Sequence, residues 1–254
     1  VSTLRVVRNE PAPPRLLLVA VEPSGDALGA ALLRELRVVM PSAQIAGCGG
    51  PAMAAAGLKS LFPIDRLSVM GFTDVARALP EAFRRARELT DLIVKERGDA
   101  VVFIDGWAFS RLCAQRMRRH APGVKLFKLG APQLWASRPQ RIGFVRRHFD
   151  GVLCLLPFEP AQFRDAGVRA EFIGNPNFQA AWAARPDRAI FRKRHNLKEE
   201  KLLAVLPGSR RGEVRRLLEP FGGAVRLLVD RVPGLRVACV LSPAVDAAAR
   251  AEIV

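Results

Sequence analysis

Residues 16–36, LLLVAVEPSGDALGAALLREL, join an apolar run to a helix-like pattern through a short polar segment. The run 16–21 has no polar alternation, which is typical of a strand buried on both faces of a sheet. The pattern from 28 to 39 has the spacing of a helix. The segment between them places two carboxylates, a hydroxyl and a glycine where a strand meets a helix: Glu22, Pro23, Ser24, Gly25 and Asp26.

The same alternation of apolar run and helical pattern continues along the chain. Strands without polar alternation, separated by helices, predict an α/β fold with a doubly wound parallel sheet of Rossmann type. The predicted strands are 16–21, 44–48, 100–104, 124–129, 151–156, 170–173, 202–206 and 235–241. The main predicted helices are 28–39, 82–97, 109–120 and 212–229.

A charged segment without a strand pattern, residues 180–201, interrupts this alternation. A new strand–loop–helix pattern begins after it, so we expect a domain boundary there. The predicted organisation is a tail, 1–14, a first domain, 15–185, and a second domain, 186–254. The second domain has two predicted strands and ends within a helical pattern, so we expect it to be incomplete.

The chain of 254 residues is strongly basic, with 40 Lys and Arg against 24 Asp and Glu and a net charge of +16. Such a balance suits an anionic partner, which is a nucleic acid, a phosphorylated substrate or an anionic membrane surface. The alternative is the Arg-rich codon usage of a GC-rich genome. The sequence has neither a membrane-spanning apolar run nor a signal-peptide pattern, and we expect a cytoplasmic protein.

The cysteines and histidines lack metal-ligand spacing, and we predict no metal site. The cysteines lie in apolar runs and are expected to be buried thiols: Cys48, Cys113, Cys154 and Cys239. The histidines lie in Arg-rich helical segments and are expected at the surface: His120, His148 and His195.

Ligands of open parallel sheets bind beyond the carboxyl ends of the strands. Glu22–Asp26 follows the first strand, and Gly25 there permits a close approach of backbone. Ser24 or Asp26 could cap the next helix, although capping leaves Glu22 unexplained.

Asp105 ends the apolar strand 100–104. A carboxylate in this position is partly desolvated and suits general-base chemistry. The alternative is that Asp105 caps the helix beginning near Ala108.

The loop Pro207–Arg210 follows a later strand and precedes a helix. Backbone amides of Gly208 and Ser209, with the guanidinium of Arg210, suit a phosphate or diphosphate. The spacing is not that of a Walker P-loop, and the alternative is a surface turn with an unrelated arginine.

A segment near residue 80 has an apolar side and an arginine-rich side. Such a helix can lie on an anionic bilayer, and the alternative is an ordinary core-facing helix with a solvated basic face. The apolar side chains are Met70, Phe72, Val75, Leu79 and Phe83, and the basic ones are Arg77, Arg84, Arg85 and Arg87.

Seven of these segments, taken in order, resemble the lipid-A-disaccharide synthase family of bacterial glycosyltransferases. No single segment is specific, but the ordered set spans nearly the whole chain. The segments are EPSGD (22–26), GGPAMAAAG (49–57), LSVMGFTDV (67–75), FID (103–105), LPFEP (156–160), FIGNP (172–176) and LPGSRRGEV (206–214).

The resemblance implies a GT-B architecture of two Rossmann-like domains facing a cleft. The implied reaction transfers 2,3-diacylglucosamine from its UDP derivative to 2,3-diacylglucosamine 1-phosphate, with inversion and without a metal or other cofactor. Asp105 matches the family's essential aspartate, a base for the acceptor 6-hydroxyl. Arg210 matches its essential arginine, which would neutralise the departing UDP diphosphate.

The resemblance also implies substrate contacts and a membrane surface. The implied substrate-binding residues are Glu22, Ser24, Gly25, Asp26, Met70, Gly71, Asn175, Gly208 and Ser209. The implied acyl or membrane contacts are Phe72, Leu79, Phe83, Arg84 and Arg85. We therefore expect the protein at the cytoplasmic face of the inner membrane, with UDP-diacylglucosamine and diacylglucosamine 1-phosphate as its substrates. We expect no nucleic-acid partner. Homo-oligomerisation is possible.

Several loops depart from the family pattern. In the first loop, Val21 stands where the family has Gly, and Pro23 stands where it has Thr or Val. The segment Gly106–Phe109 lacks the second carboxylate of the family. Residues 130–137 differ from the family's SPSVWAW, and Asn175 stands where the family has His. Two alternative hypotheses follow from these departures and from the short second domain. One is a divergent paralogue with another sugar or lipid acceptor, and the other is a non-catalytic lipid- or phosphate-binding remnant.

Overall fold

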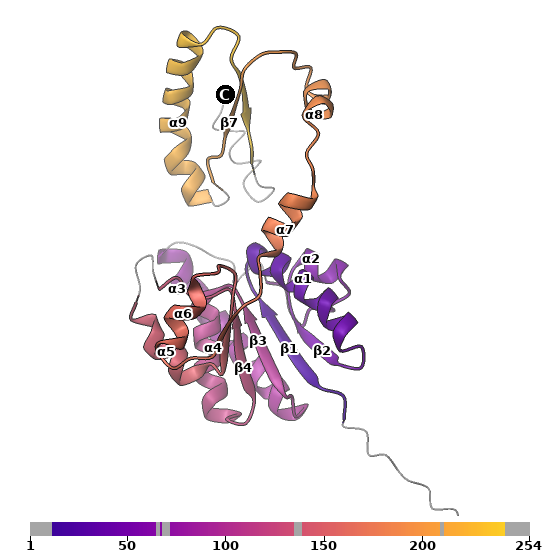
Figure 1. The fold of residues 1–254 in the computed structure, drawn as a ribbon. Helices are drawn as coiled ribbons and strands as arrows, with labels where there is room; N and C mark the ends of the chain where they lie inside the picture. Colours follow the sequence, from indigo (N-terminus) through magenta and orange to yellow (C-terminus); the bar gives the residue numbers. More distant parts are fainter. Residues whose placement is uncertain (1–11, 65–66, 68–71, 135–138, 209–210, 242–254) are drawn as a thin grey trace, which may run out of the picture. The chain divides into compact units, whose positions relative to one another are not determined.

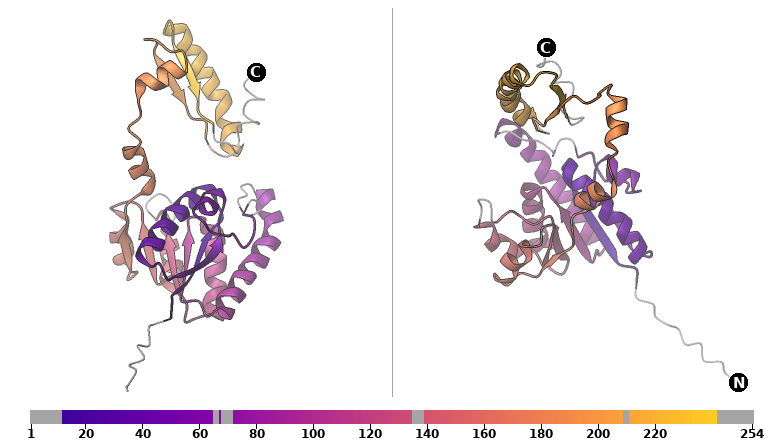
Figure 2. Two further views of the ribbon diagram at one scale, coloured as in Figure 1. Left: turned by 90° about the vertical axis from the view of Figure 1, so that its right-hand side faces the viewer. Right: turned by 45° about the horizontal axis from the view of Figure 1, so that its top comes forward.

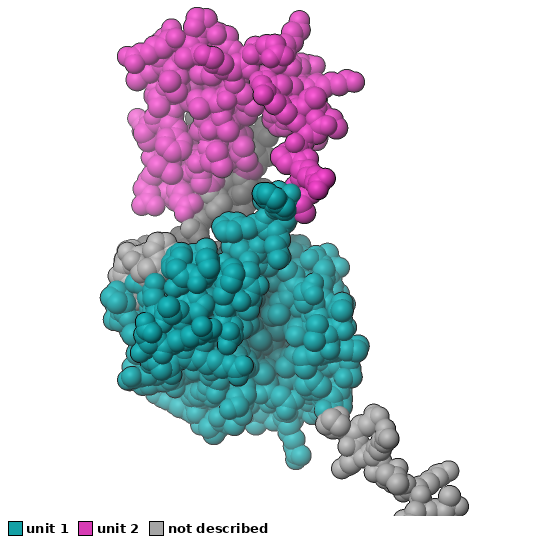
Figure 3. Space-filling view, viewed as in Figure 1, with its two compact units in different colours: residues 1–182 teal, residues 183–254 magenta. Residues whose placement is uncertain are grey.

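The computed structural model describes residues 12–64, 67, 72–134, 139–208 and 211–241 (Figure 1). The chain divides into two compact units, unit 1 (Val1–Trp182) and unit 2 (Ala183–Val254), which Figure 3 colours separately. This division falls within the charged segment 180–201.

Unit 1 is built on a parallel sheet of six strands in the order β2-β1-β3-β4-β5-β6. The predicted parallel sheet is confirmed, and each strand lies close to its predicted position. The strands are β1 (Arg15–Ala20), β2 (Gln44–Cys48), β3 (Ala100–Ile104), β4 (Lys125–Leu129), β5 (Gly151–Cys154) and β6 (Ala170–Phe172).

Helices cover both faces of this sheet, as Figures 1 and 2 show. One face carries α1 (Pro23–Val39) and α2 (Pro51–Ala55). The other carries α3 (Phe72–Lys95), α4 (Trp107–His120), α5 (Arg141–His148) and α6 (Glu159–Arg164). The sheet is therefore doubly wound.

Residues 16–20 of β1 and all of β3 are apolar because alternate residues face two different cores. Leu17 and Phe103 pack on the α3–α4 side, whereas Leu18 and Ile104 pack on the α1–α2 side. Successive side chains of a strand point to opposite faces, so a strand covered on both faces needs apolar residues at every position.

Helix α3 begins at Phe72, ten residues before the predicted start, and contains Pro80. A proline inside a helix removes one backbone hydrogen bond and usually marks an end, which is why the pattern predicted a later start. Ala86, Leu89 and Ile93 anchor this helix in the core.

Unit 2 contains a parallel pair of strands, β7 (Leu202–Val205) and β8 (Arg236–Cys239), connected through α9 (Arg211–Arg231). This is one β-α-β unit, and its two strands lie close to their predicted positions. Helix α7 (Pro176–Ala183) leads to the division, and α8 (Arg188–Arg194) follows it, with Asp187 capping its first turn.

Two predictions about burial need correction. Cys48, Cys113 and Cys154 are buried as predicted, but Cys239 is exposed, because the last residue of β8 lacks a covering layer among the described residues. His120 and His195 are exposed, but His148 is half-buried, stacked on Phe144.

Candidate active site

The sheet of unit 1 has a topological switch point between β1 and β3. Strand β1 pairs with β2 on one side and with β3 on the other, so the connections after β1 and β3 lead to opposite sides. Ligands of doubly wound sheets bind at such a point, beyond the carboxyl ends of the strands.

Ser24 and Asp105 meet at this switch point. The Ser24 hydroxyl donates a hydrogen bond of 2.5 Å to Oδ2 of Asp105. Ser24 is exposed and Asp105 half-buried, so the pair lies at the surface of the site. Two residues 81 positions apart in sequence are thus joined where the topology predicts a ligand.

Helix α1 begins at Pro23, five residues before the predicted start. Proline fits the first position of a helix because its missing N–H would have no helical partner there. The N-cap is Glu22, and no side chain caps this helix. The prediction that Ser24 or Asp26 caps it is therefore wrong: both lie inside the helix, and their side chains reach other elements.

Gly25 lets α1 approach the end of β3. A Cβ at this position would lie 2.9 Å from the carbonyl oxygen of Ile104 and 3.3 Å from the Asp105 Cβ. Any larger residue would push the first turn of α1 away from β3, and with it the Ser24 hydroxyl.

Asp26 is buried, with 4% of its surface exposed, and binds the start of α2. Its carboxylate accepts backbone N–H bonds from Gly50 at 2.8 Å, Ala52 at 2.8 Å and Met53 at 2.9 Å. A negative charge at a helix start satisfies amides that have no partner in the helix. Asp26 thus joins α1 to α2 beside the site.

Asp105 and Gly106 form a left-handed turn, with φ values of 51° and 48°. For a residue with a side chain this conformation costs on the order of 1 kcal/mol. The Asp105 N–H donates to Leu129 O at 2.9 Å, and the Asp105 carbonyl accepts from Ser110 Oγ at 3.1 Å. Helix α4 has Gly106 as its N-cap and no side-chain cap, so the alternative role of Asp105 as a cap is wrong.

Glu22 borders the same turn. A Cβ on Gly106 would lie 3.6 Å from the Glu22 Oε1 and 3.1 Å from the Val21 Cγ2. The structure therefore brings together Glu22, Ser24 and Asp105 from the predicted set, with Gly25 allowing their approach.

Lys128 is a charged residue of this region that the sequence patterns did not predict. It lies in β4, only 1% exposed, and its ammonium donates to the carbonyls of Asp105 at 2.7 Å and Leu129 at 2.9 Å. Burial lowers its pKa to about 8, although the charges of Asp105 and Glu22 act in the opposite direction. Lys128 pairs in register with Phe103 of β3. Because β4 contains a second lysine, Lys125, whose side chain is 65% exposed, the sequence pattern does not separate the buried lysine from the exposed one.

Asn175 lies apart from this cluster, after the edge strand β6. Its Oδ1 accepts the N–H of Asn177 at 3.0 Å, which stabilises the start of α7.

Gly208 follows β7 in unit 2 and has a φ of 115°, and a Cβ there would lie 2.7 Å from the Glu213 Cβ. This position thus requires glycine. Ser209 and Arg210 lie outside the described residues, as do Met70 and Gly71 before α3.

The predicted membrane helix is α3, whose side chains are described from Leu79 onward, so that of Phe72 is not. Leu79 and Phe83 are 46% and 58% exposed. Arg84 and Arg85 form ion pairs of 2.7–3.1 Å with Glu81 and Glu88 of the same helix.

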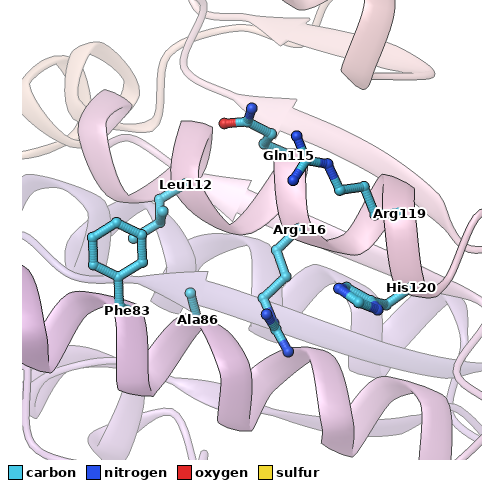
Figure 4. A pocket seen from close by; sticks show the side chains of 7 residues that line it. All are labelled: Phe83, Ala86, Leu112, Gln115, Arg116, Arg119 and His120. Carbon is cyan, nitrogen blue, oxygen red and sulfur yellow. The ribbon is translucent and has the colours of Figure 1, made fainter.

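An open pocket of about 190 Å³ lies between α3 and α4 (Figure 4). Its lining combines apolar side chains with basic ones: Phe83, Ala86, Leu112, Gln115, Arg116, Arg119 and His120. It lies on helices of one face of the sheet, and the Ser24–Asp105 pair does not line it.

Within the described ranges there is no cluster of three or more His, Cys, Asp or Glu side chains arranged to hold a metal ion. The helices in these ranges are also too short or too polar to span a membrane.

The comparisons with known proteins agree with the resemblance seen in the sequence. Residues 16–251 match the family described as LpxB, lipid-A-disaccharide synthetase. A lipid-A-disaccharide synthase of Rhodospirillum centenum is 40% identical over 232 residues, which cover 91% of this chain and 58% of that protein. One of Rhodopseudomonas palustris is 39% identical over 234 residues, covering 87% and 59%. The chain thus spans less than two thirds of the length of the curated relatives it matches.

The complex of S. aureus MnaA with UDP superimposes with a TM-score of 0.63 at 12% identity, covering 94% of this chain and 64% of that one. This likeness is one of fold, and it agrees with the predicted Rossmann-type parallel sheet. With the family match over nearly its whole length, the chain belongs to the lipid-A-disaccharide synthetase family.

Proposed function

We propose that the whole protein is an inverting glycosyltransferase of lipid A biosynthesis. It transfers 2,3-diacylglucosamine from UDP-2,3-diacylglucosamine to 2,3-diacylglucosamine 1-phosphate, giving lipid A disaccharide 1-phosphate and UDP. Family membership and the names of the relatives support this activity. The observation that carries it is the Ser24–Asp105 hydrogen bond at the switch point between β1 and β3.

In this proposal Asp105 is the general base. An ionised carboxylate there accepts the proton of the acceptor 6-hydroxyl as that oxygen attacks the anomeric carbon. Ser24 fixes the orientation of the carboxylate through its 2.5 Å hydrogen bond. Glu22, beside Gly106, contributes to positioning the acceptor.

The donor diphosphate is assigned to the loop after β7. Backbone amides of Gly208 and Ser209 precede α9, and Arg210 supplies the positive charge that stabilises the departing UDP. The similar fold of S. aureus MnaA, solved as a complex with UDP, supports a UDP-sugar donor. The arginine would fill the electrostatic role of a metal ion, and we propose that none is required.

The decisive experiment incubates the full-length protein with both substrates and detects the disaccharide 1-phosphate by mass spectrometry. Asp105→Ala and Arg210→Ala should each abolish turnover while the circular-dichroism melting curve stays unchanged. The matched control is Asp91→Ala, which removes a carboxylate that is 66% exposed on α3. Absence of product from the wild type, or normal turnover in either variant, would contradict the proposal.

We also propose that α3 contacts the anionic inner-membrane surface on its cytoplasmic side. Exposed Leu79 and Phe83, one helical turn apart, and the basic side chains Arg116 and Arg119 nearby support this contact. The salt bridges of Arg84 and Arg85 leave less charge for lipid than the sequence predicted.

Sedimentation with phosphatidylglycerol vesicles tests this contact. Replacing Leu79 and Phe83 by glutamine should release the protein from the vesicles. The control is Val94→Gln, a similar change of a 49% exposed residue farther along the same helix. Equal sedimentation of both variants and the wild type would rule the contact out.

A further inference from the structure

Lys128 occupies a position that is costly for a charged residue. It lies in the middle layer of unit 1, 1% exposed, on the same face of β4 as the fully buried Leu126. Ammonium groups are almost never buried unless they are paired, since they lose their hydration. A lysine in this position therefore requires a reason other than stability.

The hydrogen bond to the Leu129 carbonyl does not supply that reason. The Leu129 carbonyl already accepts the Asp105 N–H at 2.9 Å. The Asp105 carbonyl lies 3.1 Å from Ser110 Oγ, but the single hydroxyl proton of Ser110 has a shorter contact, 2.8 Å, with the Gly106 carbonyl. The third partner of the ammonium, the Phe103 carbonyl, is 3.4 Å away. An apolar side chain would leave the Leu129 carbonyl paired, whereas the Asp105 carbonyl would keep only its longer contact with Ser110 Oγ.

The ammonium instead lies directly beneath the left-handed turn. Its shortest contact, 2.7 Å, is with the carbonyl of Asp105, the residue whose φ is 51°. A hydrogen bond from a charged donor is about twice as strong as a neutral one. Lys128 thus gives the carbonyl of Asp105 its shorter hydrogen bond and fixes the peptide that follows it. The same restraint sets the direction of the Asp105 side chain toward Ser24.

We propose that Lys128 is a positioning residue, whose buried ammonium holds the Asp105–Gly106 turn in the geometry that presents the Asp105 carboxylate to the acceptor. This inference rests on the proposed function of Asp105 as the base. It assigns the lysine no contact with substrate.

The charged groups that act on this ammonium from the neighbouring elements are Asp105, after β3, and Glu22, at the start of α1. Both favour its protonated form, whereas burial disfavours it. Because its pKa is about 8, the ammonium is mostly intact at pH 7 and is lost as the pH rises above that value.

The test compares Lys128→Met with Lys125→Met in the full-length protein. Lys125 is the control because it lies on the same strand with its side chain 65% exposed. Lys128→Met should lower kcat on the order of 100-fold with KM within about twofold, because a misplaced base slows chemistry without weakening binding. The alkaline fall in wild-type kcat near pH 8 should be absent in this variant.

Two results would overturn the proposal: wild-type kcat in a folded Lys128→Met protein, or a wild-type kcat that stays constant from pH 7 to 10. The second needs no variant. If the wild type makes no disaccharide, the proposed function fails, and the crystal structure of Lys128→Met then decides the inference by itself. Loss of the Ser24–Asp105 hydrogen bond and of the left-handed turn supports it, and an unchanged turn overturns it.

Discussion

The charged side chains at the carboxyl edge of the sheet differ from those on α3 in burial and in partners. At the edge, Asp26 and Lys128 are 4% and 1% exposed, and their partners are backbone groups, most of them outside their own helix or strand. On α3, Arg84 is 54% exposed and pairs with glutamates of its own helix. Buried charge is costly unless it is well bonded, whereas exposed ion pairs contribute little. The edge charges are thus the ones whose removal should matter.

Among substitutions of these charged side chains, Asp26→Ala should cause the largest loss of unfolding free energy. It removes a buried carboxylate that three backbone amides bind, and we expect a loss of unfolding free energy on the order of 4 kcal/mol. Denaturant titration measures it. Asp91→Ala, at an exposed carboxylate of α3, should change the unfolding free energy little. Equal losses in the two variants would contradict the difference between buried and exposed charges.

Lys128 should behave in the opposite way to Asp26, since its burial as a cation opposes folding. Its folded pKa of about 8 lies below the ordinary 10.5, so between these values the unfolded chain holds the proton and the folded chain does not. The unfolding free energy of the wild type should therefore rise by about 3 kcal/mol relative to Lys128→Met from pH 8 to pH 10.5.

This difference is measured by denaturant titration of both proteins across that pH range. Thiol ionisation affects both proteins alike, so it cancels in the difference. A gap that stays constant with pH would mean that Lys128 is not a buried cation.

Ser24→Ala tests an exposed side chain at the same carboxyl edge of the sheet. Ser24 is exposed and its hydroxyl binds the half-buried Asp105 carboxylate, so its loss leaves the core intact and the melting temperature should stay unchanged. We expect kcat to fall about tenfold, since one neutral-to-charged hydrogen bond orients the base. Ser42→Ala, before β2, is the matched control, and unchanged kcat in Ser24→Ala would remove Ser24 from the site.

The smallest effect should come from Arg84→Ala. Loss of its exposed ion pairs should shift the melting temperature by no more than about 2 °C. A calorimetric scan measures the shift. A fall in melting temperature as large as that of Asp26→Ala would show that the ion pairs of α3 also stabilise the fold.

The sheet could be predicted from the sequence because burial on both faces leaves apolar runs such as 16–21 and 100–104 without polar alternation. Ser24 and Asp105 could be predicted because polar residues after parallel strands converge on one edge. Their contact follows from the strand order, which places β1 beside β3.

The partners of Asp26 and the position of Lys128 could not be predicted in the same way. Asp26 binds amides more than twenty positions away, and a polar residue at a helix start resembles a local cap. A lysine near a strand end resembles a solvent-facing residue, because local sequence does not contain the carbonyls that the Asp105–Gly106 turn directs toward it.

The proposed mechanism requires the acceptor to lie at the switch point between β1 and β3, against Asp105. A crystal structure of the full-length Asp105→Asn protein with diacylglucosamine 1-phosphate tests this requirement most directly. We expect the acceptor 6-hydroxyl within hydrogen-bond distance of residue 105, about 2.6–3.2 Å. An acceptor bound at another edge of the sheet, with its 6-hydroxyl facing a different carboxylate, would contradict the mechanism.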